Sequence, residues 1–228
     1  MNLELKSPRR GFLRSTALVG GGLVVAIAVP GARRFAWAQE AQPAAATAFA
    51  PNAFLRVAAD DSITVLLAHA EMGQGIWTTL PMLIAEELDA DWSKIRVEHG
   101  PADKAYTSPV FGMQGSGGST PTWSAFGRYR QAGAAPRALL LQAAAARLNV
   151  PVDQLRTENG AVVSGSTRLR YGELADDAGK QAPPALDALK LREPKDWKLI
   201  GKATRRLDTP EEITGKAVVG MDIQFEGL

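Results

Sequence analysis

A glutamine between two glycines is the first feature of this sequence whose residue types could bind a ligand. The segment reads Glu71-Met72-Gly73-Gln74-Gly75 and lies between two apolar runs. Glycine lets the backbone approach a bound group closely, and the Gln74 amide offers both a hydrogen-bond donor and an acceptor. The same pattern is compatible with a tight strand-to-helix turn in which Gln74 has no role. The segment is therefore a candidate site that needs a second signal.

A second candidate is a loop of glycines and small hydroxyl residues. It reads Gly115-Ser116-Gly117-Gly118-Ser119-Thr120 and stands directly before Pro121 and a long helical pattern. Free backbone N–H groups, hydroxyls and the positive end of a helix dipole together favour a phosphate or pyrophosphate. No Gly-Lys-Ser/Thr follows, so this is not a Walker loop. The alternative is a flexible surface loop before a well-capped helix.

Several other residues favour structural roles. His69 and His99 lack a neighbouring cluster of metal ligands, so we predict two partly buried histidines and no metal site. Trp77 and Trp123 adjoin the two candidate loops and are predicted to pack in the core. No Ser-His-Asp triad or catalytic carboxylate pair stands out. The absence of cysteine excludes disulfides, thiolate zinc sites and iron–sulfur ligation by this chain.

The elements that position the first loop follow from periodicity. Apolar runs at 54–58 and 63–68 flank a polar Asp-Asp-Ser turn and predict a β-hairpin. Apolar residues at helical spacing predict a helix over 78–90. Glu86 and Glu87 fall on the other side of that helix, where we expect them to face solvent.

The elements around the second loop can also be predicted from the sequence pattern. Alternation at 95–99 predicts a short strand, and the Gly/Pro/Ser-rich loop at 100–118 is too long to be a simple connector. Ser119 or Thr120 is predicted to cap a helix that runs to about Leu148. Together these elements predict an α+β fold in which a mixed sheet carries two long helices.

The rest of the chain predicts smaller elements and a second domain. Asn159-Gly160 between β-like runs predicts a hairpin, and a short helix is predicted from Tyr171. The first domain therefore spans 52–181. A Pro-rich linker follows at 182–196, and 197–228 is predicted to be the start of a small β-rich domain.

The first 38 residues have the composition of an export signal. They hold six cations against one anion, with an uncharged apolar stretch and then Ala36-Trp37-Ala38 as a small-x-small cleavage pattern. Arg9-Arg10, a spacer and Phe-Leu resemble the twin-arginine motif, whose receptor accepts folded cargo. A general secretory signal and an uncleaved anchor are the alternatives. Residues 39–51, rich in Ala and Pro, are predicted to form a linker.

The net charge does not indicate a nucleic-acid partner. The formal net charge is +2, but the basic excess belongs to the leader, and the remainder of the chain holds more acidic than basic side chains. No nucleic acid is therefore expected among the partners.

Taken together, these motifs resemble the molybdopterin-binding large subunit of the xanthine dehydrogenase and aldehyde oxidase family. The resemblance rests on Ala-His-Ala-Glu-Met-Gly-Gln-Gly at 68–75, the helix through 86–88, the strand at 95–97 and the loop at 115–119, in matching order and spacing. It is closest in type to exported isoquinoline 1-oxidoreductase beta subunits, of which this chain resembles the N-terminal portion. Residues 198–217 resemble the start of that family's a/b hammerhead-like domain, here truncated.

The resemblance implies a role for each loop. Gln74 would approach the oxo ligand of molybdenum as a catalytic residue, with Gly73 and Gly75 against the pterin. The second loop would hold the dinucleotide part of the molybdenum–molybdopterin cofactor, expected to be the cytosine form, through Gly115, Ser116, Gly117, Gly118, Ser119 and Thr120. The implied reaction oxidises an aldehyde or N-heteroaromatic substrate with water-derived oxygen.

The resemblance also implies partners and a location. Electrons would pass to a small two-cluster iron–sulfur subunit, with a cytochrome c subunit as a further partner. Because the cofactor is inserted into a folded subunit, export by the twin-arginine translocase is expected, to the periplasm or the outer face of the cytoplasmic membrane.

One departure from the family limits this expectation. The family's catalytic glutamate lies near the far C-terminus of the large subunit, beyond Leu228, so we expect this chain alone to be a catalytically incomplete part of a molybdenum-dependent oxidoreductase. The alternative is a catalytically inactive remnant or a non-enzymatic exported binding protein.

Overall fold

The computed structural model of the chain describes residues 47–225 and 227. The predicted signal at 1–38 and the linker residues 39–46 lie outside the described residues. The prediction of a linker as far as 51 is wrong at its end, because Thr47–Asn52 forms strand β1 and its backbone pairs with the next strand. Among the described residues, no helix is long and apolar enough to span a membrane.

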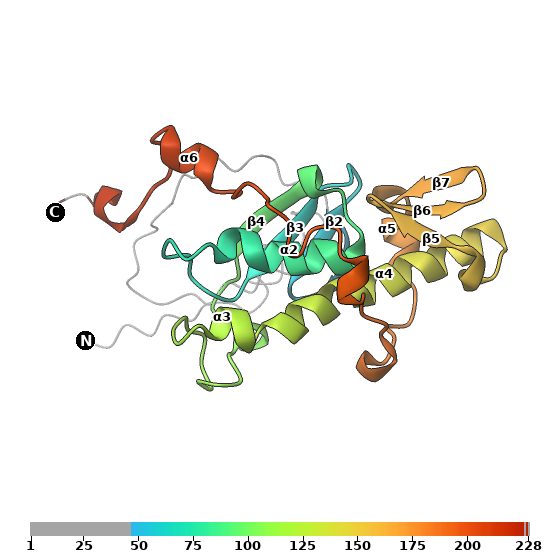
Figure 1. Ribbon diagram of the computed structural model, residues 1–228, viewed down its shortest axis with the longest axis horizontal. Helices are drawn as coiled ribbons and strands as arrows, with labels where there is room; N and C mark the ends of the chain where they lie inside the picture. Colours follow the sequence, from blue (N-terminus) through green and yellow to red (C-terminus); the bar gives the residue numbers. More distant parts are fainter. Residues whose placement is uncertain (1–46, 226, 228) are drawn as a thin grey trace, which may run out of the picture. The chain divides into compact units, whose positions relative to one another are not determined.

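A four-stranded mixed sheet in the order β1-β2-β3-β4 carries the candidate site (Figure 1). β2 (Leu55–Ala58) and β3 (Ile63–Leu67) pair antiparallel, which confirms the predicted hairpin. β3 and β4 (Ile95–His99) pair parallel, because helix α2 (Ile76–Leu88) forms the crossover between them. The α+β class is therefore confirmed, and the carboxyl end of β3 leads directly into the Gln74 segment.

The second long helix, α4 (Phe126–Leu148), packs along α2 and extends to α5 (Tyr171–Ala178) and a second sheet (Figure 1). That sheet is an antiparallel meander of β5 (Arg156–Glu158), β6 (Ala161–Ser164) and β7 (Thr167–Arg170). Its first turn is the predicted Asn159-Gly160, in which both residues have positive φ. Short 3-10 turns lie at Trp92–Lys94, Lys104–Tyr106, Val152–Gln154, Leu186–Ala188, Pro194–Asp196 and Gly220–Asp222.

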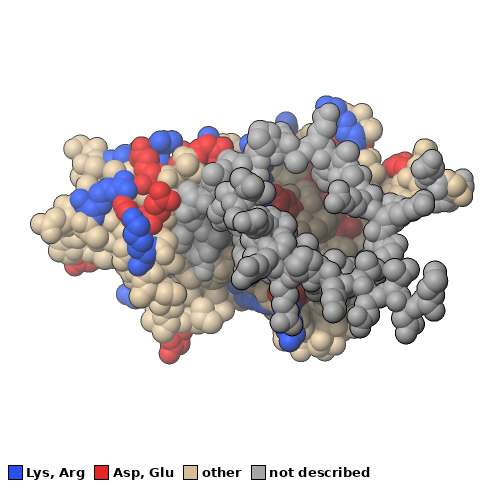
Figure 2. All heavy atoms as spheres, turned by 180° about the vertical axis from the view of Figure 1, so that it is seen from behind, with Lys and Arg blue, Asp and Glu red and all other residues tan. Residues whose placement is uncertain are grey.

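Charges of both signs gather over the end of the molecule that carries the second sheet (Figure 2). Arg168 lies 3.4 Å from Glu158, and Arg170 lies 2.7 Å from Asp61. Such exposed pairs add little stability, and their opposite signs cancel over this surface. On the face that Figure 2 shows, positive and negative side chains are therefore mixed at this end.

The prediction of one helix from residue 120 to Leu148 is wrong. Helix α3 (Thr120–Trp123) ends after four residues, and α4 begins at Phe126. The Thr120 carbonyl accepts from the N–H groups of Ser124 and Ala125, at 3.1 and 3.2 Å, and from the Ser124 hydroxyl at 2.8 Å. This sharing of one carbonyl interrupts the regular helical ladder.

The prediction that Glu86 and Glu87 face solvent is also wrong. Glu86 is 1% exposed to solvent and Glu87 is 0% exposed. The Glu87 carboxylate accepts from Arg130 Nε at 2.7 Å, on the neighbouring α4. Glu86 Oε2 accepts from three successive backbone N–H groups of residues 198–200, at 2.9, 2.6 and 3.1 Å. Both carboxylates therefore bind other segments of the chain, which a helical pattern cannot reveal.

The same contacts correct the expected start of a β-rich domain at 197–228. The described residues of that range contain no strand and only one α-helix, α6 (Thr209–Ile213). The N–H groups of 198–200 donate to Glu86, and the Leu207 N–H donates to the Thr78 hydroxyl at 2.9 Å. Backbone donors that a strand would offer to a neighbouring strand are thus bound by side chains of α2.

Helices α2 and α4 pack closely at Gly133, where an added Cβ would lie 2.4 Å from the Ile84 carbonyl oxygen. We expect Gly133→Ala to lower the free energy of unfolding by about 1–3 kcal/mol, because backbone atoms would have to move apart. Gly127→Ala is the matched control in the same helix, where a Cβ meets nothing within 4 Å. It should raise the free energy of unfolding by about 0.5–1 kcal/mol. Urea denaturation measures both, and equal effects would contradict the close crossing.

Candidate functional site

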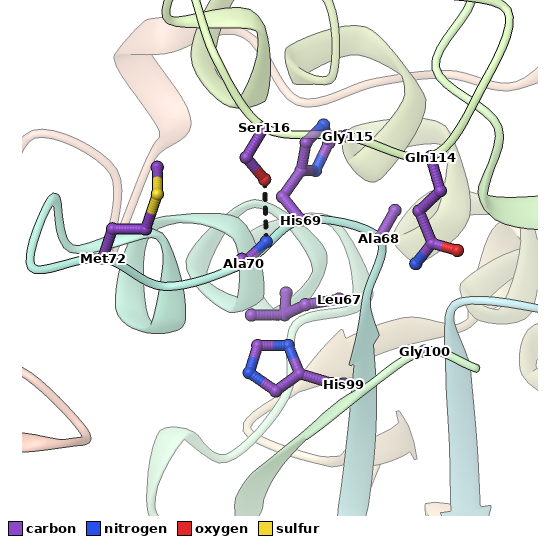
Figure 3. Close-up of a pocket in the computed structure, with 10 residues that line it drawn as sticks. All are labelled: Leu67, Ala68, His69, Ala70, Met72, His99, Gly100, Gln114, Gly115 and Ser116. Atoms are coloured by element: carbon purple, nitrogen blue, oxygen red, sulfur yellow. Dashed lines mark hydrogen bonds between the residues drawn. The ribbon is translucent and has the colours of Figure 1, made fainter. Parts of the chain in front are cut away.

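Two segments that are far apart in the sequence meet at the carboxyl end of β3 (Figure 3). The Ala70 N–H donates to the Ser116 hydroxyl oxygen at 2.8 Å, which joins the Gln74 segment to the glycine loop. Between them lies a cavity of about 430 Å³. It is lined by Leu67, Ala68, His69, Ala70, Met72, His99, Gly100, Gln114, Gly115 and Ser116. The structure therefore places the two candidate loops around one cavity.

A buried tyrosine on α4 fixes the end of β3 beside this cavity. The Tyr129 hydroxyl accepts from the Ala68 N–H at 3.0 Å and donates to the Leu66 carbonyl at 3.4 Å. Burial raises the pKa of Tyr129 well above its ordinary value, so the phenol keeps the proton that it donates. The backbone on both sides of Leu67 is therefore held by one side chain.

The long loop at 100–118 is also fastened to the domain. The Tyr106 hydroxyl donates to the Ala53 carbonyl at 2.6 Å. Arg128, on α4, donates to the Thr107 carbonyl at 3.0 Å and to the Ala105 carbonyl. These contacts hold residues 105–107, the part of the loop that precedes the glycines.

His69 presents an unsatisfied polar atom at the cavity. The residue is 7% exposed, and its Nδ1 is buried without a hydrogen-bond partner among the described residues. Burial, and then the nearby charge of Arg128, lowers the pKa of His69, so the imidazole is neutral at pH 7. The ring lies beside Gly115 in the cavity wall (Figure 3). Its Nδ1 is therefore an unsatisfied hydrogen-bonding atom beside the cavity, which a ligand could reach only if the atoms that cover it moved.

Sequence reasoning assigned His69 only a structural role. The signal that could have identified it is its position, just after β3 ends and just before the glycine-flanked Gln74. Polar residues at the carboxyl end of a strand in a strand-helix-strand unit commonly contact ligands. His99, the other histidine, is exposed, and its ring lies 4.7 Å from the ring of Trp77.

Glu71 organises the turn that carries Gln74. Its Oε1 accepts from the N–H groups of Gly73 and Gly75 at 2.8 and 2.9 Å, and its Oε2 accepts from the Trp77 N–H at 2.7 Å. Both glycines have φ near +90°, a conformation that other residues rarely adopt. Partial burial raises the pKa of Glu71, but the three hydrogen bonds together hold it below its ordinary value. The Glu71 carboxylate therefore occupies the N-terminal end of α2.

Gln74 itself is exposed and does not line the cavity. Its Nε2 donates to the Ala70 carbonyl at 2.8 Å, and its Oε1 accepts from the Met72 N–H. Both functions of the amide are thus used within its own turn. To contact a ligand in the cavity, the Gln74 side chain would have to exchange these two partners.

Only the first part of the glycine loop borders the cavity. Gly115 and Ser116 line it, whereas residues 117–120 form a turn beyond it. Thr120 is 2% exposed, and its hydroxyl donates to the Gly117 carbonyl at 2.7 Å. Ser119 makes no side-chain cap, and α3 has only four residues. The predicted anion site at the N-terminus of a long helix is therefore wrong in this respect.

The two tryptophans beside the loops differ. Trp77 is partly buried and packs against the core, as predicted. Trp123 is 62% exposed, and its Nε1 donates to the Gly118 carbonyl at 3.0 Å, so the prediction that it packs in the core is wrong. Its indole supports the glycine turn from the solvent side.

Comparison with known proteins shows the family of this chain. Residues 4–214 match the family model of the molybdopterin cofactor-binding domain. The chain is 36% identical over 259 aligned residues to the isoquinoline 1-oxidoreductase subunit beta of Brevundimonas diminuta, covering 96% of this chain and 32% of that protein. It is 31% identical over 224 aligned residues to the membrane-bound aldehyde dehydrogenase (pyrroloquinoline-quinone) of Gluconacetobacter polyoxogenes, covering 96% and 28%.

Among solved structures, quinoline 2-oxidoreductase from Pseudomonas putida 86 matches with a TM-score of 0.44 at 23% identity, over 59% of this chain and 17% of that one. The chain thus spans about a third or less of the length of the curated relatives that it matches. The family resemblance drawn from the two loops is confirmed by the family model and by these sequence identities.

The lowered pKa of Glu71 predicts a pH-dependent turn. A depressed carboxylate pKa contributes stability above the unfolded value and loses it as the pH falls through the folded value. Protection of the Gly73, Gly75 and Trp77 amides from hydrogen exchange, corrected for intrinsic rates, should therefore hold at neutral pH. It should be lost only as the pH falls through the lowered pKa of Glu71, below the ordinary pKa of a glutamate. Glu71→Gln should remove much of this protection at neutral pH, while Glu211→Gln, on the exposed α6, should not. Unchanged protection in Glu71→Gln would contradict the assignment.

Proposed function

This chain belongs to the molybdopterin cofactor-binding domain family, and from that membership we propose that its two loops hold part of a molybdenum–molybdopterin dinucleotide, in the cytosine form. The observation that carries the proposal is the hydrogen bond from Ala70 to Ser116, which closes the two loops around one cavity. Ligand cavities of this size, with a few convergent polar groups, are typical cofactor sites.

The residues around the cavity fit such a group. His69 offers a buried polar atom that no described residue satisfies. The backbone N–H groups of residues 115–117 donate to no other described residue, so they are free for phosphate oxygens.

Each residue has a definable task toward the bound group. The neutral His69 imidazole would form one hydrogen bond through Nδ1, and the 115–117 backbone would bind the dinucleotide phosphates. Gln74 would turn its amide from Ala70 and Met72 toward the cofactor, while Glu71 keeps the backbone of the turn in place. When bound, the cofactor supplies transfer of a water-derived oxygen to substrate and uptake of two electrons.

We propose that the whole protein is an oxidoreductase for an aldehyde or an N-heteroaromatic substrate. The support is the activity for which two relatives are named: one is an isoquinoline 1-oxidoreductase subunit and the other an aldehyde dehydrogenase. Electrons would pass to a small two-cluster iron–sulfur subunit and on to a cytochrome c subunit. This chain has no cysteine and so could not itself hold the clusters.

Cofactor content tests the proposed site. The chain, produced in a host that makes molybdenum cofactor, should purify with molybdopterin. Ser116→Ala and His69→Phe should each lower the molybdopterin bound per chain about fivefold at limiting cofactor, because each removes one hydrogen bond worth about 1 kcal/mol. Ser166→Ala, in an exposed turn of the second sheet, is the matched control and should bind as the wild type does.

Three results would contradict the proposed site. These are a wild-type chain without molybdopterin, equal content in all variants, and release of pyrroloquinoline quinone in place of molybdopterin. The first would favour the inactive remnant or non-enzymatic binding protein. The last would favour the chemistry in the name of the Gluconacetobacter relative.

We also propose export to the periplasm by the twin-arginine route, as a folded and loaded complex that stays there or at the outer face of the cytoplasmic membrane. The support is the paired Arg9 and Arg10 before an uncharged stretch. Changing both to Lys should leave the protein in the cytoplasm, whereas Arg14→Lys should not. Cell fractionation measures this, and unchanged export of the double variant would exclude the route.

A further inference from the structure

Arg206 joins a distant segment of the chain to the turn that carries Gln74. Its Nη1 donates to the Gly73 carbonyl at 3.2 Å, and its Nη2 lies 3.7 Å from Glu71 Oε1. The Asp208 carboxylate holds the same guanidinium, with Nε donating to Oδ1 at 2.9 Å and Nη2 donating to Oδ2. The guanidinium therefore bridges Asp208 and the turn.

The backbone beside Arg206 is itself anchored to α2. The Leu207 N–H donates at 2.9 Å to the hydroxyl of Thr78, a residue that is 4% exposed in the first turn of that helix. The Leu207 side chain packs against the core. With its backbone fixed and its guanidinium held by Asp208, the Arg206 side chain is preorganised to meet the Gly73 carbonyl.

The backbone of this turn could adopt other conformations if its carbonyl groups were not held as well. Gly73 and Gly75 flank Gln74 with φ of +93° and +88°, and glycine leaves the backbone many alternative conformations. Glu71 binds only the N–H groups of the turn. Arg206 binds the carbonyl of the peptide that links Gly73 to Gln74, a peptide that Glu71 does not hold.

We propose that Arg206 is a positioning residue, which sets the direction of the Gln74 side chain by fixing the Gly73–Gln74 peptide. That this direction matters for binding of the cofactor rests on the proposed function. The effect of Arg206 on the conformation of the turn does not. The contact differs from an ordinary surface ion pair, such as that of Arg206 with Glu212 at 3.5 Å, because it reaches a backbone carbonyl beside a site residue.

The test compares two neighbouring arginines in the full chain. Arg206→Ala should shift the amide nitrogen resonance of Gln74, since that nitrogen belongs to the peptide whose carbonyl loses its hydrogen bond. Hydrogen exchange of residues 72–77 should become about three- to fivefold faster, the effect of losing one exposed charge-assisted contact. Arg205→Ala is the control, because the exposed Arg205 side chain makes no hydrogen bond or ion pair with another described residue. It should change neither quantity.

Two further variants separate positioning from general destabilisation. Arg206→Lys keeps the charge, but one ammonium group cannot reproduce the planar fork, so its spectrum should resemble that of Arg206→Ala. Hydrogen exchange of the backbone amides in β2 and β3 should be unchanged in both Arg206 variants. Two results would overturn the proposal: a Gln74 amide resonance in Arg206→Ala at its wild-type position, or a wild-type spectrum in Arg206→Lys.

Cofactor content of the same samples keeps the two proposals apart. A wild-type chain without molybdopterin would overturn the proposed function. The change in the Gln74 amide resonance would then still test whether Arg206 fixes the turn. If the wild type is loaded, Arg206→Ala should hold less molybdopterin than Arg205→Ala. Equal loading of the two variants would overturn the functional part of the positioning role.

Discussion

Three buried carboxylates at the C-terminal end of α2 are the constraint on which the assembly of this domain depends. Glu86, Glu87 and Asp89 lie at the negative end of the helix dipole and are at most 5% exposed. Unpaired carboxylates there would cost several kcal/mol each, so every one must find donors. The donors come from elsewhere in the chain, which makes the cluster a junction of distant segments.

The cluster determines what packs where. Glu87 binds Arg130 of α4, and Asp89 binds the Thr157 hydroxyl of the second sheet at 3.0 Å. Asp89 also pairs with Lys198 at 2.8 Å, and its pKa lies below the ordinary value although burial raises it. Backbone N–H groups of 198–200 complete the set on Glu86. One end of α2 thus holds a helix, a sheet and a C-terminal segment together.

The other end of α2 depends on this arrangement. The segment fixed by Glu86 at 198–200 continues to Leu207, which binds Thr78 in the first turn of the helix. Glu71 occupies the same end through three backbone N–H groups. A ligand therefore cannot use that helix terminus unless it displaces Glu71, whereas the cavity between the loops is open to one.

Local features of this fold could be predicted from the sequence, and long-range ones could not. The hairpin around 59–62, the strand at 95–99 and the Asn159-Gly160 turn follow from patterns within a few residues. The exposure of Glu86 was misjudged because its partners lie over a hundred residues later. The break at Ser124 arises from shared hydrogen bonds on one carbonyl, and the role of His69 from burial beside a cavity formed by two distant loops.

The position of molybdenum in crystals of the cofactor-loaded chain, located by its anomalous scattering, tests the central claim most directly. The account predicts the metal and its pterin between residues 68–75 and the glycine loop, with a cofactor atom within hydrogen-bonding distance of His69 Nδ1. Molybdenum bound elsewhere on the chain, with only water in the cavity, would contradict it.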